Sequence, residues 1–99
     1  MSKTIELPKF YEDLTPPYLN KRKDELKLLH TCFVEGNVDH IQKVAHKIAG
    51  SGGSYGLPEI SRLGKEIELA AEKNNPQELK ELLDTFTDYL ESIEVVYKD

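Results

Sequence analysis

Apolar residues recur along most of this chain every three or four positions, and the breaks between these runs predict four amphipathic helices. The first helix begins at Thr15, which we expect to be its N-cap, because the two prolines that follow suit a first helical turn. Gly36 ends this helix. Asn37 then caps the second helix, whose apolar spacing continues as far as Gly56, the expected stop.

The second half of the chain repeats this pattern. Pro58 suits the first turn of the third helix, and Gly64 lies on the apolar stripe of that helix, where it permits close packing. Asn75 caps the fourth helix, whose apolar face we expect to continue through Ile93 to Tyr97. Since no period-two pattern has turn signals on both sides, the sequence predicts no strand.

Short connections between the four runs favour antiparallel neighbours. The predicted fold is therefore all-α, an antiparallel up-down four-helix bundle formed by residues 15–99. Residues 1–14 form a short N-terminal arm or helix. The apolar residues of this arm need burial, so we expect it to cover one end of the bundle.

Length and charge narrow the class of protein. Ninety-nine residues form one domain, and the net charge of −5 argues against nucleic acid or an anionic membrane surface as a partner. The single cysteine, Cys32, falls on the core stripe of the first helix and allows no internal disulfide. The N-terminus lacks the apolar stretch of a signal peptide, and no apolar run reaches membrane-spanning length, so we expect a cytoplasmic monomer.

The segment 45–56 holds four glycines in twelve residues, although its apolar residues keep helical spacing. Glycine inside a helix costs about 0.5–1 kcal/mol relative to alanine, so several glycines beside one histidine indicate a need for open space. On a helical wheel His46 lies about 140° from Ile41 on the core face, with Gly50 and Gly53 beside it. We therefore expect the His46 side chain to lie in water, accessible to a partner.

An exposed imidazole is largely unprotonated at neutral pH, and its free nitrogen is a nucleophile that can accept a phosphoryl group. Phosphoryl transfer needs mainly alignment and charge neutralisation, and Lys43 and Lys47 flank His46 within about one helical turn. Gln42 and Ser54 border the same face, where we expect them to contact a partner.

Other kinds of chemistry are disfavoured. The sequence has no glycine-rich nucleotide loop and no acidic cluster with the spacing of a magnesium site, so it is not expected to take a phosphoryl group from ATP unaided. His40 and His46 are six residues apart, which does not match the four-residue spacing of zinc ligands on a helix. We therefore expect no metal and no cofactor.

The segment around the histidine resembles the signature of the histidine-containing phosphotransfer (HPt) domains of multistep two-component signalling. That signature is a histidine followed by a basic residue, then Gly-Ser and a further glycine, and it stands here as His46, Gly50, Ser51 and Gly56. The resemblance covers roughly residues 15–95. Further matching positions are Tyr18, Leu19, Asn20, Lys21 and Arg22, then Gly36, Asn37, Val38 and Asp39, and finally Leu63, Lys65 and Glu66.

The resemblance implies that His46 takes a phosphoryl group from an aspartate of a response-regulator receiver domain, or passes one to it. The receiver supplies the magnesium and most of the catalytic groups, so the chain is implied to be a phosphocarrier and not an enzyme. A sensor or hybrid histidine kinase is the other implied partner. The chain departs from the family at Ala49, where a lysine is common, and Lys43 or Lys47 are the available substitutes.

Two alternatives remain at this point. The same helical face would also serve a module that binds a receiver or kinase without being phosphorylated, and such binding would be unchanged by His46→Gln. A purely structural bundle, such as a homodimer, would need an exposed apolar strip away from His46, for which only Leu69 and Val95 are candidates.

Overall fold

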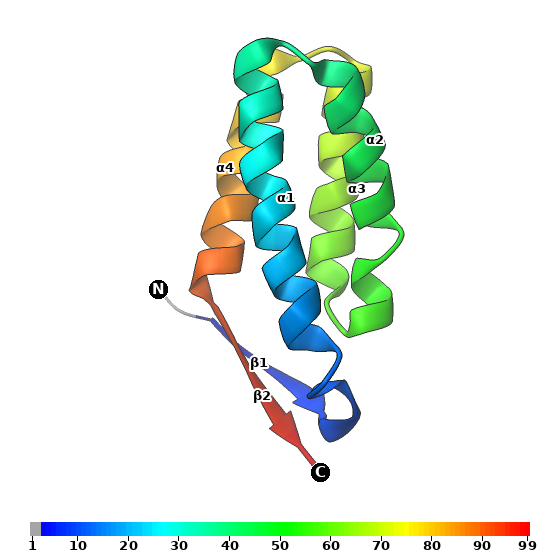
Figure 1. The fold of residues 1–99 in the computed structure, drawn as a ribbon, viewed down its shortest axis with the longest axis vertical. Coiled ribbons are helices and arrows are strands. Elements are labelled where there is room, and N and C mark those ends of the chain that lie inside the picture. Colours follow the sequence, from blue (N-terminus) through cyan, green and yellow to red (C-terminus); the bar gives the residue numbers. More distant parts are fainter. Residues whose placement is uncertain (1–2) are drawn as a thin grey trace.

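Four helices account for most of the computed structural model, which describes residues 3–99: α1 (Thr15–Glu35), α2 (Val38–Ala49), α3 (Pro58–Glu72) and α4 (Pro76–Ser92). The prediction of four helices is confirmed. In Figure 1 the chain passes along the long axis four times, with the α1–α2 and α3–α4 connections at one end and the α2–α3 connection towards the other. No helix in the described part of the chain is long and apolar enough to cross a membrane.

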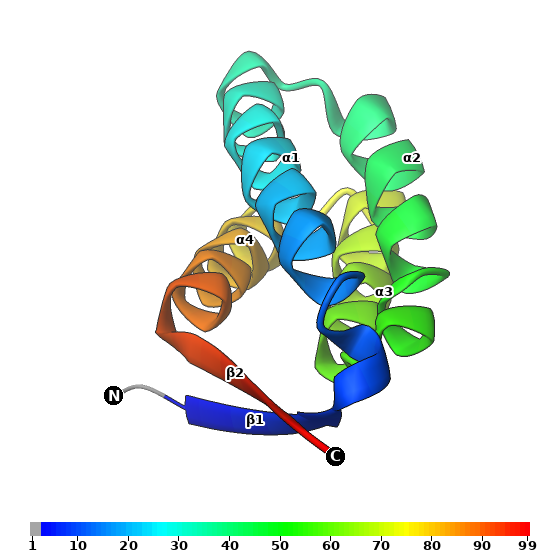
Figure 2. The same ribbon diagram turned by 60° about the horizontal axis from the view of Figure 1, so that its bottom comes forward.

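Two strands correct the all-α prediction. β1 (Lys3–Pro8) and β2 (Ile93–Lys98) form a parallel two-stranded sheet in which Ile5 lies opposite Val95. Figure 2 shows this sheet beneath the bundle. The expectation that Ile93 and Tyr97 extend the last helix is therefore wrong. The β-branched run of β2 suits a strand, but α4 leads into it without a turn residue, and its partner lies at the other end of the sequence.

The second helix is shorter than its apolar spacing suggests. It ends at Ala49, and a 3₁₀ turn, η2 (Gly52–Tyr55), follows before α3. Gly52 packs so closely on α3 that a Cβ there would lie 2.6 Å from the backbone nitrogen of Ser61. This tertiary contact replaces the helical continuation, and Gly56, at φ 78°, ends η2 instead of α2.

Two of the three predicted N-caps are confirmed. The side chains of Asn37 and Asn75 each accept a hydrogen bond from a backbone N–H three residues ahead. Thr15 is not an N-cap, because the helix begins at this residue and Leu14 precedes it. The Thr15 hydroxyl instead donates to the Tyr55 carbonyl at 3.3 Å, which ties the start of α1 to η2.

One close approach sets the position of α2 on α3. A Cβ at Gly64 would lie 2.7 Å from the backbone nitrogen of Ala49 and 2.9 Å from a methyl group of Ile48. The expected close packing at Gly64 is therefore confirmed, and it brings α3 against the last turn of α2. The core between the helices is formed by Leu26, Leu29, Ile41, Ala45, Ile48, Ile60, Leu63, Ile67, Leu79, Leu83, Phe86 and Leu90.

The N-terminal arm covers part of the lower end of the bundle. Leu7 is buried, and its side chain packs at Gly56. A 3₁₀ turn, η1 (Lys9–Tyr11), connects β1 towards α1, and Phe10 within it stays 75% exposed. Cys32 lies in the core as expected, and burial, together with the charge of Glu35, raises the pKa of its thiol.

Candidate functional site

His46 lies in the last turn of α2 and faces solvent, as the helical wheel predicts. Its side chain is 75% exposed, whereas Ala45 and Ile48 on the same helix are buried in the core. The amphipathic pattern of α2 is thus what turns the imidazole outward.

The closest polar partner of His46 is a residue that sequence reasoning missed. Glu68 on α3 places its Oε2 atom 2.7 Å from Nδ1 of His46, and only 14% of its side chain is exposed. Glu68 lies one turn after Gly64, so it stands on the same side of α3 as the glycine that approaches α2. The four-residue spacing from Gly64 to Glu68 was the feature of the sequence that could have predicted this contact.

The charge of Glu68 determines which ring nitrogen of His46 is free. Desolvation by itself would raise the pKa of Glu68, but the hydrogen bond from His46 and the charge of Lys65 outweigh it, so the pKa lies below its ordinary value. Glu68 is therefore a carboxylate at neutral pH and can only accept a hydrogen bond. Nδ1 of His46 therefore donates to it, and in the neutral imidazole the lone pair then lies on Nε2, where it is available as a nucleophile.

An open hollow surrounds the imidazole. Its volume is about 530 Å³, and α2 and α3 contribute its walls: Asp39, Gln42, Lys43, His46, Lys47 and Glu68. The structure thus brings together four of the residues singled out in the sequence, namely Gln42, Lys43, His46 and Lys47. The lining combines two basic side chains, Lys43 and Lys47, with two acidic ones, Asp39 and Glu68.

Three other singled-out residues lie outside this hollow, beyond the end of α2. Gly50 is the C-cap of α2, and Gly53 and Ser54 belong to η2. All three are exposed, and a Cβ at Gly53 would meet no atom within 4 Å. None of the three lines the hollow around the imidazole.

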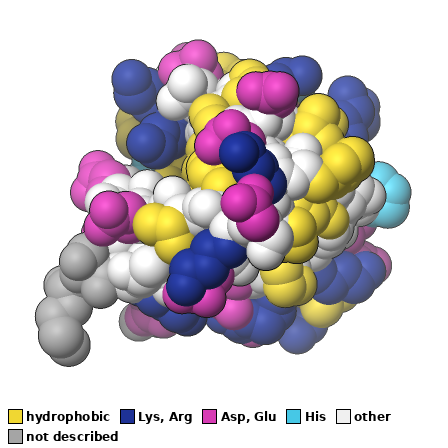
Figure 3. Space-filling model, turned by 90° about the horizontal axis from the view of Figure 1, so that it is seen from below, with side chains coloured by type: hydrophobic (Ala, Val, Ile, Leu, Met, Phe, Trp, Pro, Cys, Tyr) yellow, Lys and Arg dark blue, Asp and Glu magenta, His cyan; other side chains and the backbone are white. Residues whose placement is uncertain are grey.

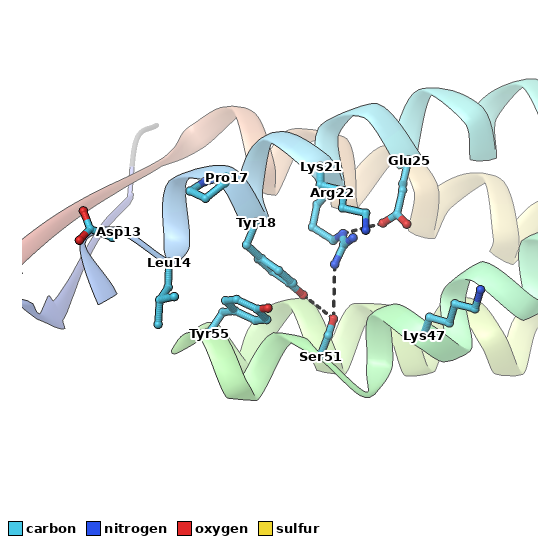
Figure 4. A pocket seen from close by; sticks show the side chains of 10 residues that line it. All are labelled: Asp13, Leu14, Pro17, Tyr18, Lys21, Arg22, Glu25, Lys47, Ser51 and Tyr55. Atoms are coloured by element: carbon cyan, nitrogen blue, oxygen red, sulfur yellow. Dashed lines mark hydrogen bonds and ion pairs between the residues drawn. The ribbon is translucent and has the colours of Figure 1, made fainter. Parts of the chain in front are cut away.

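A second cleft, of about 500 Å³, lies between α1 and η2, and Lys47 lines it as well. Figure 4 shows Tyr18 and Arg22 pointing from α1 towards Ser51, which follows α2. The hydroxyls of Tyr18 and Ser51 are 2.7 Å apart, and Ser51 Oγ also donates to the Ile48 carbonyl at 3.1 Å. These contacts hold the end of α2, and with it the turn that carries His46.

The Arg22 guanidinium is buried in the same cleft. It stands 4.5 Å over the centre of the Tyr18 ring and pairs with Glu25 at 2.5 Å. Tyr18 in turn stacks on Tyr55 at 4.2 Å. Since its charge is balanced by Glu25 and its plane rests on an aromatic ring, Arg22 serves to fix α1 against η2.

Comparison with known proteins gives one match. The family model described as "Hpt domain" matches residues 16–95. No curated protein and no solved structure matches the chain.

Proposed function

Because the chain belongs to the Hpt family, whose members are phosphocarriers of two-component phosphorelays, we propose that His46 is the residue that carries the phosphoryl group. The proposed partner in the transfer is the phosphorylated aspartate of a response-regulator receiver domain, which gives the group to His46 or receives it from His46. The observation that supports this choice is the exposed imidazole whose Nδ1 is held by Glu68.

The hydrogen bond to Glu68 suits the chemistry of the transfer. The lone pair of Nε2 forms the new N–P bond, the P–O bond to the aspartate breaks, and the aspartate carboxylate leaves with the electron pair. The imidazole then carries a proton on Nδ1 and a phosphoryl group on Nε2, so the ring gains positive charge. The Glu68 carboxylate, 2.7 Å from Nδ1, stabilises that charge and keeps the ring in one orientation.

Two of the side chains that line the hollow are the groups that would neutralise the transferred anion. Lys43 and Lys47 line the hollow with His46 and would offset the negative charge of the phosphoryl group. Lys43 and Lys47 would thus supply the positive charge that a lysine supplies in family members at the position of Ala49. Gly50 and Gly53, which carry no side chain, leave the approach of the partner unobstructed.

The test is incubation of the full chain with a receiver that has been phosphorylated on its aspartate. A label that is acid-labile, stable in alkali and absent from His46→Gln would support the proposal. His40→Gln is the matched control, because it removes a second, half-buried histidine of α2 that does not line the hollow. If receivers bind His46→Gln as well as the unmodified chain, and none transfers phosphate, the chain would instead be a binding module.

A further inference from the structure

The two-stranded sheet leaves hydrogen-bonding groups without partners. Among residues 3–99 the sheet consists of β1 and β2 alone, so each strand has one unpaired edge. A sheet of two strands is marginally stable in water, and an open edge is a template for a further strand. Figure 3 shows the corresponding end of the molecule, where hydrophobic side chains lie among charged ones.

The two edges differ in their protection. Both strands have a lysine at one end, Lys3 in β1 and Lys98 in β2, but β1 also ends at Pro8, which lacks an N–H group and so discourages further pairing. β2 has no proline. Its apolar residues Val95, Val96 and Tyr97 are all only partly buried, whereas β1 buries Leu7. The edge of β2 is therefore the one open to a further strand.

The sequence of β2 complements itself. Leu7 faces the bundle, so alternation along the strands places Glu94, Val96 and Lys98 on the outer face. The ion pair between Lys98 and Glu6 at 2.8 Å lies on this face too. When two copies of β2 run antiparallel about a two-fold axis at Val96, Glu94 of each copy stands opposite Lys98 of the other.

We propose that β2 pairs with β2 of a second copy of this chain, in antiparallel orientation and in the register that centres on Val96. The product is a symmetric dimer with a continuous four-stranded sheet in the order β1-β2-β2-β1. Its cross-strand pairs are Val96 with Val96, Val95 with Tyr97 and Glu94 with Lys98, and pairs of these kinds stabilise antiparallel sheets. A single self-complementary patch is what a two-fold dimer requires.

The experiment uses two charge reversals, studied separately and mixed. In Glu94→Lys the dimer would bring lysines opposite each other at positions 94 and 98, and in Lys98→Glu it would bring glutamates together. A mixed dimer of the two variants restores opposite charges at both positions. Glu81→Lys on the exposed face of α4 is the control that matches the charge change of Glu94→Lys.

The readout is the molar mass in light scattering at about 100 µM of the full chain, a concentration at which a micromolar dimer is formed. We expect twice the 11.3 kDa chain mass for the unmodified protein and for Glu81→Lys. In a dilution series from that concentration we expect the mass of each edge variant alone to fall at about tenfold higher concentration than that of the unmodified chain, because each variant alone weakens dimerisation by about tenfold or more, and we expect the mixture to follow the unmodified chain. Circular dichroism checks that the helices persist in every variant.

Three results would overturn the proposal: a monomeric unmodified chain at about 100 µM, edge variants that dissociate at the same concentration as the unmodified chain, or a mixture that dimerises no better than either variant alone. The proposed phosphoryl transfer is tested independently, since the edge variants change no residue of the His46 hollow. Their acceptance of phosphate on His46 therefore separates a failure of the dimer from a failure of the proposed function.

Discussion

Removal of the Glu68 carboxylate is the sharpest perturbation of the proposed site. A charge-assisted hydrogen bond contributes about 1.5–3 kcal/mol. Since the His46 side chain is 75% exposed, water replaces part of the lost interaction, and the lower end of that range applies. A loss of about 1.4 kcal/mol corresponds to a tenfold slower reaction. We therefore expect Glu68→Ala to transfer phosphate about tenfold more slowly, with an intermediate effect for Glu68→Gln, which retains an acceptor oxygen but no charge.

The assay follows phosphoryl transfer from a phosphorylated receiver under single-turnover conditions, with the phosphorylated chain separated by gel or intact mass. Glu66→Ala is the matched control, because Glu66 lies on the same helix but pairs with Arg62 and not with His46. Nitrogen chemical shifts of the His46 ring provide a second readout, since loss of Glu68 should mix the two neutral tautomers. A wild-type rate together with an unchanged tautomer in Glu68→Ala would refute the assigned role.

Further outcomes follow from the same geometry. Gly50→Leu should fold, as circular dichroism would show, because a Cβ there meets only ordinary contacts at 3.7 Å and 3.8 Å. The same variant should transfer phosphate about tenfold more slowly in transfer kinetics, because the leucine side chain obstructs the partner. Gly64→Ala should lower the free energy of unfolding by about 1–3 kcal/mol in urea titrations, whereas Gly53→Ala, with nothing within 4 Å, should change it by less than about 0.5 kcal/mol. The pKa of Glu68 is lower in the folded state, so its carboxylate stabilises the fold above the unfolded-state pKa of about 4.3. This stabilisation is lost as the pH falls through the folded-state pKa. The difference in the free energy of unfolding between the unmodified chain and Glu68→Gln should therefore shrink from pH 6 to pH 3 in urea titrations.

The positions of the helices and the exposure of the histidine follow from short-range patterns. Asn37 and Asn75 cap their helices through contacts that span only three residues, so the sequence is sufficient to predict them. The three- and four-residue spacing of apolar residues likewise places the core face of α2 inward and His46 outward. Gly64 could be predicted as a point of close packing, because a glycine on the apolar face of a helix costs helix stability and lets a neighbouring backbone approach.

The remaining features depend on contacts between segments that are distant along the chain. Thr15 bonds to Tyr55 instead of capping its own helix, and α2 stops early because Gly52 packs on α3. β1 and β2 pair across almost the whole length of the sequence, and neither run shows its partner locally. The pairing of His46 with Glu68 is of this kind too. Periodicity reports which face of a helix is buried, but only packing decides which carboxylate of the next helix reaches the imidazole.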